Sequence, residues 1–205
     1  AEAQMQNLQT LLAEVPSAAD VVVMPETALP GTIDEEELQL SPAVSRLREA
    51  LRQSHPETMV AVGASTVKIY ESQQRPTATA RTGMGFYYDV YNSAIAINGD
   101  GKDDLHHKMR LVIGVEAMPA FVSRLDSFID LGGITGQLGR NDEATVFHKR
   151  EVVAGPAICY EGLYGEAFAR FVREGANLML VMSNDGWWGN TPGHKRLFDF
   201  CRLRA

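Results

Sequence analysis

Short apolar runs rich in β-branched residues recur along the chain, and segments with helical periodicity lie between them. A short continuous apolar run is typical of a strand that is buried on both faces. Strands that alternate with helices in this way favour a layered α/β architecture. The predicted strands are Val21–Met24, Met59–Ser65, Tyr91–Ile97, Thr145–His148, Val152–Cys159 and Leu178–Ser183.

The segments between the strands are predicted as helices or loops. Ser41 and Pro42 suit the N-cap and the first position of a helix. Gly31–Glu37 is predicted as a loop, and Tyr70–Tyr91, which is polar and then Gly-rich and aromatic, as a long hairpin or loop. The predicted helices are residues 1–15, Ser41–Gln53, Phe121–Ile129, Gly165–Glu174 and His194–Ala205.

The chain of 205 residues is acidic, with 19 Lys and Arg against 26 Asp and Glu and a formal net charge of −7. A nucleic-acid-binding protein needs a basic face for the phosphates, so this balance argues against a nucleic-acid partner. No apolar run in the sequence approaches the ~20 residues that a membrane-spanning helix needs.

Both ends of the sequence lie inside helical patterns. The first residue is Ala1 instead of Met, and the last residues, Cys201–Ala205, carry no Gly or Pro stop signal. We therefore expect residues 1–205 to form one domain of a longer protein.

Two residues with chemically useful side chains follow predicted strands directly. Glu26 comes after Val21–Met24, and Cys159 ends a strand just before a turn into a helix. Ligands gather at the strand ends of α/β sheets, and a helix start offers N–H donors that stabilise a thiolate. Taken alone, each residue has an ordinary alternative, a loop carboxylate and a buried structural thiol. Cys201, inside a helical pattern, is expected to be a structural or surface thiol.

Two further clusters stand out. His106 and His107 precede Lys108, but adjacent strand residues point to opposite faces, so no metal site is expected there. The ordinary interpretation of this basic cluster is a solvated face. Trp187 and Trp188 lie side by side between two glycines, which is not a core pattern and indicates a binding rim.

Taken together and in chain order, Glu26, Lys108 and Cys159 resemble the Glu–Lys–Cys triad of the nitrilase superfamily of carbon–nitrogen hydrolases. From about Val21 to Ala205 the chain also resembles the catalytic domain of the apolipoprotein N-acyltransferase family, in its Bacteroidetes-type branch. The segments that carry this resemblance are Met24–Pro30, His107–Val112 with Glu116 and Pro119, Ile158–Glu161 and Ser183–Gly189; Gly114–Pro119 and Leu131–Gly136 resemble the branch.

The resemblance implies an αββα sandwich of the nitrilase type, incomplete at both ends. It also implies that residues 1–205 are the periplasmic catalytic domain of a protein of the bacterial inner membrane, attached through segments outside this chain. The expected reaction moves a fatty acyl chain from a phospholipid to the N-terminal amine of a diacylglyceryl-cysteine lipoprotein through a thioester. No cofactor and no metal are expected.

The resemblance also assigns roles to residues. Cys159 is expected to be the nucleophile and Glu26 the general base, while Lys108 and the backbone N–H of Tyr160 form the oxyanion hole. Two carboxylates, Glu116 and Glu161, would orient the lysine and the substrate path. A rim formed by Trp187 and Trp188 would contact the lipid substrate.

One position departs from the family pattern. The family commonly has a Gln-His pair where this chain has Arg196-Leu197, so the nearby His194 is given no role. Two alternatives to the acyltransferase stay open: a soluble nitrilase-like amidase that hydrolyses a small amide with the same triad, and a binding module without activity. The presence of all three triad residue types disfavours the binding module.

Overall fold

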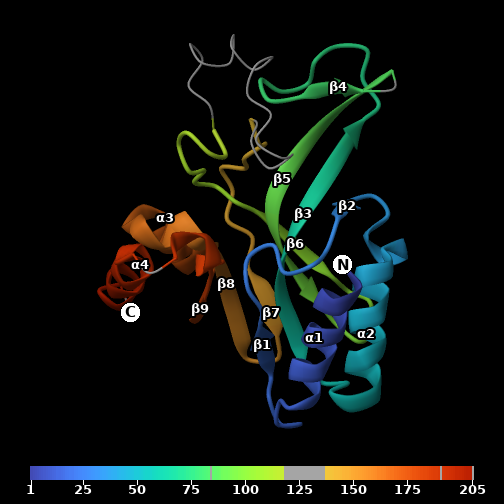
Figure 1. The fold of residues 1–205 in the computed structure, drawn as a ribbon, viewed down its shortest axis with the longest axis vertical. Helices are drawn as coiled ribbons and strands as arrows, with labels where there is room; N and C mark the ends of the chain where they lie inside the picture. The colour runs from blue at the N-terminus through green and yellow to red at the C-terminus, as the bar shows by residue number, and fades with distance from the viewer. Residues whose placement is uncertain (84, 118–136, 190, 205) are drawn as a thin grey trace.

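The computed structural model describes residues 1–83, 85–117, 137–189 and 191–204, without the side chains of Trp187 and Trp188. Within these ranges helices and strands are interspersed along the chain, as the apolar runs predicted (Figure 1). The helices and 3-10 turns are α1 (Glu2–Ala13), η1 (Leu38–Leu40), α2 (Pro42–Ser54), η3 (Cys159–Leu163), α3 (Gly165–Arg173), η4 (Asp185–Trp188) and α4 (Gly193–Arg202). The strands are β1 (Val21–Val23), β2 (Thr32–Asp34), β3 (Met59–Tyr70), β4 (Arg81–Gly83), β5 (Phe86–Ile97), β6 (Asp104–His107), β7 (Phe147–Lys149), β8 (Val152–Ile158) and β9 (Leu178–Met182).

The strands form two sheets. The larger sheet follows the order β1-β3-β5-β4, with β2 added to β3 and β6 added to β5. Its centre is the long antiparallel pair β3–β5, in which Val60 faces Ile97 and Tyr70 faces Tyr87. The smaller sheet has the order β7-β8-β9, with β8 and β9 parallel.

Alternate residues of β3 and β5 bury opposite faces of the larger sheet, which produces the layers. On one face, Val60 and Ile97 pack against apolar residues of α1 and α2. On the other face, Ala61 and Ala94 pack against Ile158 of the smaller sheet. Phe171 of α3 covers the outer side of the smaller sheet. The predicted αββα layering is therefore confirmed.

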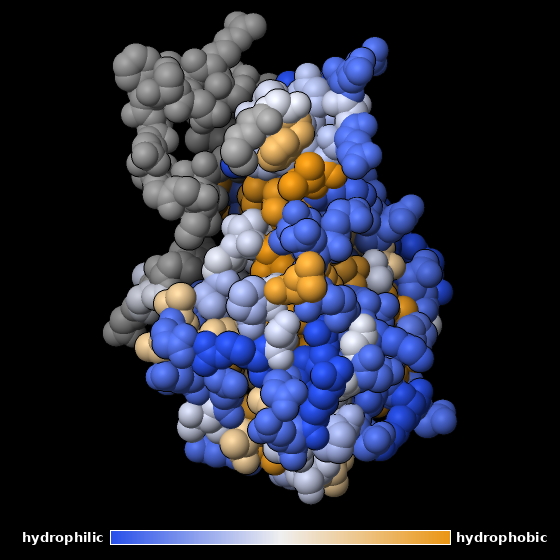
Figure 2. Space-filling view, turned by 90° about the vertical axis from the view of Figure 1, so that its right-hand side faces the viewer, coloured by the Kyte–Doolittle hydropathy of each residue, from blue (hydrophilic) through white to orange (hydrophobic). Residues whose placement is uncertain are grey.

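Figure 2 looks onto the side of the molecule that carries α1 and α2. The lower part of this side is largely hydrophilic, as expected for helices whose apolar faces are turned toward a sheet. Pro42 occupies the first position of α2 after Ser41, as predicted, although the Ser41 side chain makes no capping hydrogen bond. Among the described residues, no helix combines the length and the apolar character that crossing a bilayer requires.

Two further segments, predicted as a loop and as a long hairpin or loop, contain strands. Gly31–Glu37 holds β2. The second half of Tyr70–Tyr91 contains β4 and the start of β5, which pair antiparallel as a hairpin, one of the two predicted alternatives. The loop prediction for Gly31–Glu37 was wrong because its residues pair with β3. In the hairpin segment, polar side chains bond to one another on the sheet: the Tyr70 hydroxyl donates to Asp89 Oδ2 at 2.9 Å and lies 3.1 Å from the Tyr91 hydroxyl. The predicted helix at Phe121–Ile129 lies outside the described residues.

Candidate active site

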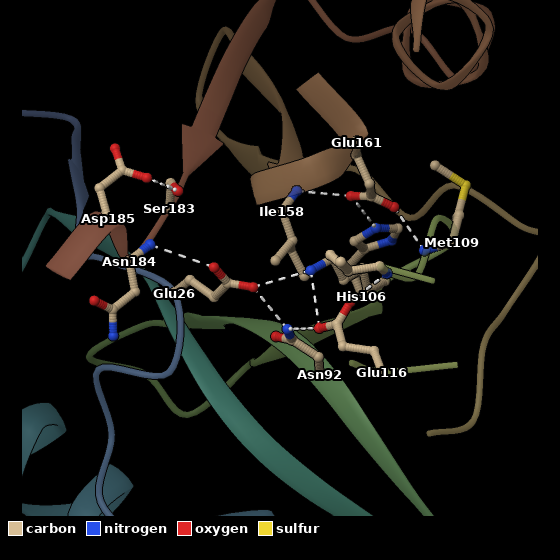
Figure 3. A network of polar contacts seen from close by, with 12 residues as sticks. Glu26, Asn92, His106, Met109, Glu116, Ile158, Glu161, Ser183, Asn184 and Asp185 are labelled. Carbon is tan, nitrogen blue, oxygen red and sulfur yellow. Dashed lines mark hydrogen bonds and ion pairs between the residues drawn. The ribbon is translucent and has the colours of Figure 1, made fainter. Parts of the chain in front are cut away.

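Ends of strands from both sheets meet at one cavity of about 460 Å³. Glu26 follows β1, Lys108 follows β6 and Cys159 follows β8, so residues far apart in the chain line the same space. Figure 3 shows the polar side chains converging there. The structure therefore brings together the three residues that resemble a Glu–Lys–Cys triad.

The Lys108 ammonium group is buried between two carboxylates. Its Nζ lies 3.0 Å from Glu26 Oε1 and 2.9 Å from Glu116 Oε1, and the residue is 1% exposed. Burial by itself lowers the pKa of Lys108, but the negative charges of Glu26 and Glu116 outweigh it and raise the pKa above the ordinary value. Lys108 is therefore a fixed cation at the floor of the cavity.

The Glu26 carboxylate is held by donors from three directions. Besides Lys108, the Asn92 side-chain amide donates to its Oε1 at 2.7 Å, and the backbone N–H of Asn184 donates to its Oε2 at 3.3 Å. The next residue, Thr27, has φ +51°, in the left-handed region that residues other than glycine seldom adopt. The chain thus turns sharply at the point where it delivers this carboxylate.

Cys159 lies at a strained backbone position directly after β8. Its φ is +47°, and strain of this kind clusters at functional sites. Burial and the Glu26 charge raise the pKa of the thiol to about 11, against the opposing effects of Lys108 and the Ser183 hydroxyl. The thiol is therefore protonated near neutral pH, and its conversion to a nucleophile requires a base.

Two further buried carboxylates hold the site together. Glu116 Oε1 binds Lys108, and its Oε2 accepts from the Val112 N–H at 2.8 Å. Glu161 accepts from the Met109 N–H at 2.6 Å and from the Ile158 N–H at 2.7 Å. Glu161 thereby ties the residue after the lysine to the residue before the cysteine.

Asn92 is a residue of the site that its sequence pattern did not single out. Its Nδ2 donates to Glu26 and to Glu116, each at 2.7 Å, so one amide group bridges the two carboxylates that hold Lys108. The available signal was its position: a polar residue next to the apolar half of the predicted strand Tyr91–Ile97. A buried polar side chain there needs partners across the sheet.

The remaining predicted residues lie in the 3-10 turns η3 and η4. Tyr160 follows Cys159 in η3, and its ring packs edge-on against Tyr164, with 5.4 Å between the ring centroids. Trp187 and Trp188 belong to η4, which follows the Asn184 N–H donor, but their side chains lie outside the described residues. Within the described part of the chain, no cluster of His, Cys, Asp or Glu could hold a metal ion.

The chain is similar in sequence to known proteins over most of its length. The chain is 27% identical over 197 residues to the apolipoprotein N-acyltransferase of Chlorobaculum tepidum, covering 91% of this chain and 36% of that protein. It is 31% identical over 189 residues to the apolipoprotein N-acyltransferase of Pseudomonas syringae pv. tomato, covering 91% and 33% respectively. The chain thus spans about a third of the length of these curated relatives.

Solved structures share the fold. XC1258 of Xanthomonas campestris, described as a CN-hydrolase superfamily protein, superposes with a TM-score of 0.60 at 16% identity, covering 99% of this chain and 65% of that one. A carbon–nitrogen hydrolase of Helicobacter pylori gives a TM-score of 0.60 at 12% identity, covering 99% and 63%. The sequence model of the carbon–nitrogen hydrolase family matches residues 1–205. The chain therefore belongs to the carbon–nitrogen hydrolase family.

Proposed function

We propose that this chain is the catalytic domain of an apolipoprotein N-acyltransferase. In this proposal a fatty acyl group passes from a phospholipid to Cys159 as a thioester, and then to the N-terminal amine of a diacylglyceryl-cysteine lipoprotein. The observation that carries the proposal is the meeting of the Cys159 thiol, the Glu26 carboxylate and the buried Lys108 ammonium group at one cavity. The similarity to apolipoprotein N-acyltransferases supports the choice of substrates.

In the first half-reaction Glu26 takes the proton from the Cys159 thiol as the sulfur attacks the ester carbonyl. Negative charge develops on the carbonyl oxygen, where Lys108 and the Tyr160 N–H stabilise it. When the C–O bond breaks, Glu26 returns the proton to the leaving alcohol. The products are a lysophospholipid and an acyl thioester on Cys159.

In the second half-reaction the free amine of the lipoprotein attacks the thioester. Glu26 takes a proton from the amine, and the C–S bond breaks as the amide forms. The proton then passes to the Cys159 sulfur, which restores the thiol. Glu116 and Glu161 act as positioning residues for Lys108 and Cys159, and Trp187 and Trp188 form part of the lipid-contacting rim.

The same proposal includes a location. A donor with two fatty acyl chains and an acceptor with a diacylglyceryl anchor both reside in a membrane. We therefore propose that the domain works on the periplasmic side of the bacterial inner membrane, held there by segments outside residues 1–205.

The test is the covalent intermediate. The full-length protein, mixed with phospholipid vesicles and no acceptor, should gain one acyl mass by intact-protein mass spectrometry. The adduct should be absent in Cys159→Ala, labile to hydroxylamine, and discharged by a diacylated lipopeptide with a free amine. Rapid release of ammonia from small amides, with no adduct from phospholipid, would instead favour an amidase.

A further inference from the structure

Cys159 forms part of the wall of two separate cavities. One is the catalytic cavity, which also contains Glu26 and Lys108. The other, of about 220 Å³, lies between η3 and α4, and Val112 and Cys159 are the lining residues that both cavities share. Cys159 therefore lies in the wall between two cavities that are lined by different kinds of residue.

The second cavity, here called the α4 pocket, is apolar. Within the described part of the chain its accessible wall has no polar surface. Leu163 of η3 forms one side, and residues of a single face of α4, spaced at i, i+3, i+4 and i+7, form the other. These lining residues of α4 are Gly193, Arg196, Leu197 and Phe200.

The two cavities differ in what they offer a reacting ester. The catalytic cavity holds the base and the ammonium group, which the leaving alcohol and the attacking amine both need. The accessible surface of the α4 pocket is apolar, although Tyr160 and Arg196 are among its lining residues, and burying a polar group against an apolar surface without a partner is costly. An unbranched acyl chain has no such requirement and gains free energy when its methylene groups leave water.

We propose that the α4 pocket binds the carboxyl-proximal part of the acyl chain attached to Cys159. This inference rests on the proposed function and adds to it the binding site and its selectivity. The leaving alcohol departs, and the attacking amine enters, through the catalytic cavity. The acyl chain stays in the α4 pocket, on the other side of Cys159. A pocket of 220 Å³ takes only the first part of a long chain, so the remainder leaves past Phe200, which is 45% exposed.

Chain-length selectivity tests the assignment. The full-length protein in detergent is acylated with p-nitrophenyl acetate or p-nitrophenyl decanoate, and the nitrophenolate burst and the added mass give the two rates. Leu163→Trp fills the α4 pocket and should lower the decanoyl-to-acetyl rate ratio about tenfold or more, since room for one methylene is worth roughly 10- to 200-fold. Phe200→Ala removes a wall at an exposed position and should lower the ratio about fivefold.

Phe198→Ala is the matched control. Phe198 also lies on α4 and is 61% exposed, but it does not line the α4 pocket, so the ratio should stay within about twofold of the unsubstituted protein. Equal ratios in all variants would overturn the acyl-chain site and leave the thioester chemistry intact. Absence of any adduct on the unsubstituted protein would overturn the proposed function itself. If Leu163→Trp does not fold by circular dichroism, the Phe200→Ala ratio decides.

Discussion

The side-chain amide of Asn92 donates a hydrogen bond of 2.7 Å to the carboxylate of Glu26, across 66 residues of sequence. The second N–H of the same amide reaches Glu116, the other carboxylate that holds Lys108. Two carboxylates that share one buried lysine repel each other. The neutral donor between them reduces this repulsion and sets their spacing.

Asn92→Asp should therefore impair acylation of Cys159. The substitution replaces a donor by a carboxylate next to Glu26 and Glu116, and the loss of a buried hydrogen bond costs about 1–3 kcal/mol, or roughly 5- to 150-fold in rate. Stopped-flow measurement of kcat/KM with p-nitrophenyl acetate gives the value. Asn7→Asp, on the exposed side of α1, is the control and should leave the rate unchanged. An unaffected rate in Asn92→Asp would remove Asn92 from the site.

Glu116→Gln should move the alkaline limb of the pH–rate profile. The charges of Glu26 and Glu116 raise the pKa of Lys108 against the opposing effect of burial. Without the negative charge of Glu116, less of the lowering effect of burial is offset. The pKa of Lys108 therefore falls, and Lys108 loses its proton at lower pH. We expect the limb to shift toward acid by roughly one pH unit or more. Glu174→Gln, at the exposed C-cap of α3, should keep the original profile. An unshifted limb in Glu116→Gln would show that Lys108 does not control it.

Gly63→Ala should disrupt the backbone that presents Glu26. A methyl group at Gly63 would lie 2.5 Å from Glu26 Cα and 2.5 Å from Thr27 N, contacts that only a shift of backbone can relieve. A displacement of about 1 Å at a reacting group costs on the order of 10²-fold in rate. Acylation rate and Tm are both measured, because overpacking also costs about 1–3 kcal/mol of stability.

Gly165→Ala is the comparison for Gly63→Ala, since the nearest atom to a methyl group there is 3.7 Å away in ordinary contact. Its rate and Tm should stay close to those of the unsubstituted protein. A Gly63→Ala protein with full activity would contradict the tight approach between β3 and the Glu26 turn.

Cys159 should be alkylated slowly at neutral pH. Burial and the Glu26 charge raise the thiol pKa to about 11, so the reactive thiolate is scarce at pH 7. In a Cys201→Ser background, the rate with iodoacetamide should rise about tenfold per pH unit between pH 8 and 10. A rate that levels off below pH 8 would indicate a thiolate paired with Lys108 and would contradict the need for a base.

Several features were predictable from the sequence because they depend on local pattern. Apolar runs of β-branched residues predict buried strands, and Glu26 and Cys159 were recognisable because each follows such a run. Lys108 became a candidate only through the resemblance of the three residues, in chain order, to the Glu–Lys–Cys triad of the nitrilase superfamily. The layered fold followed from the alternation of strands with helices, and the structure confirms it.

The partners of these residues were decided by tertiary structure. Asn92 reaches Glu26 because β1 and β5 flank β3 in the same sheet, and nothing local to position 92 specifies that neighbourhood. Gly63 must lack a side chain because the turn after β1 crosses β3 at this point. The polar half of β5 forms a strand because its side chains bond across the sheet, as Tyr70 does with Asp89. Local pattern determines which residues are buried, whereas strand order and register determine which buried polar groups meet, because those contacts join residues distant in the chain.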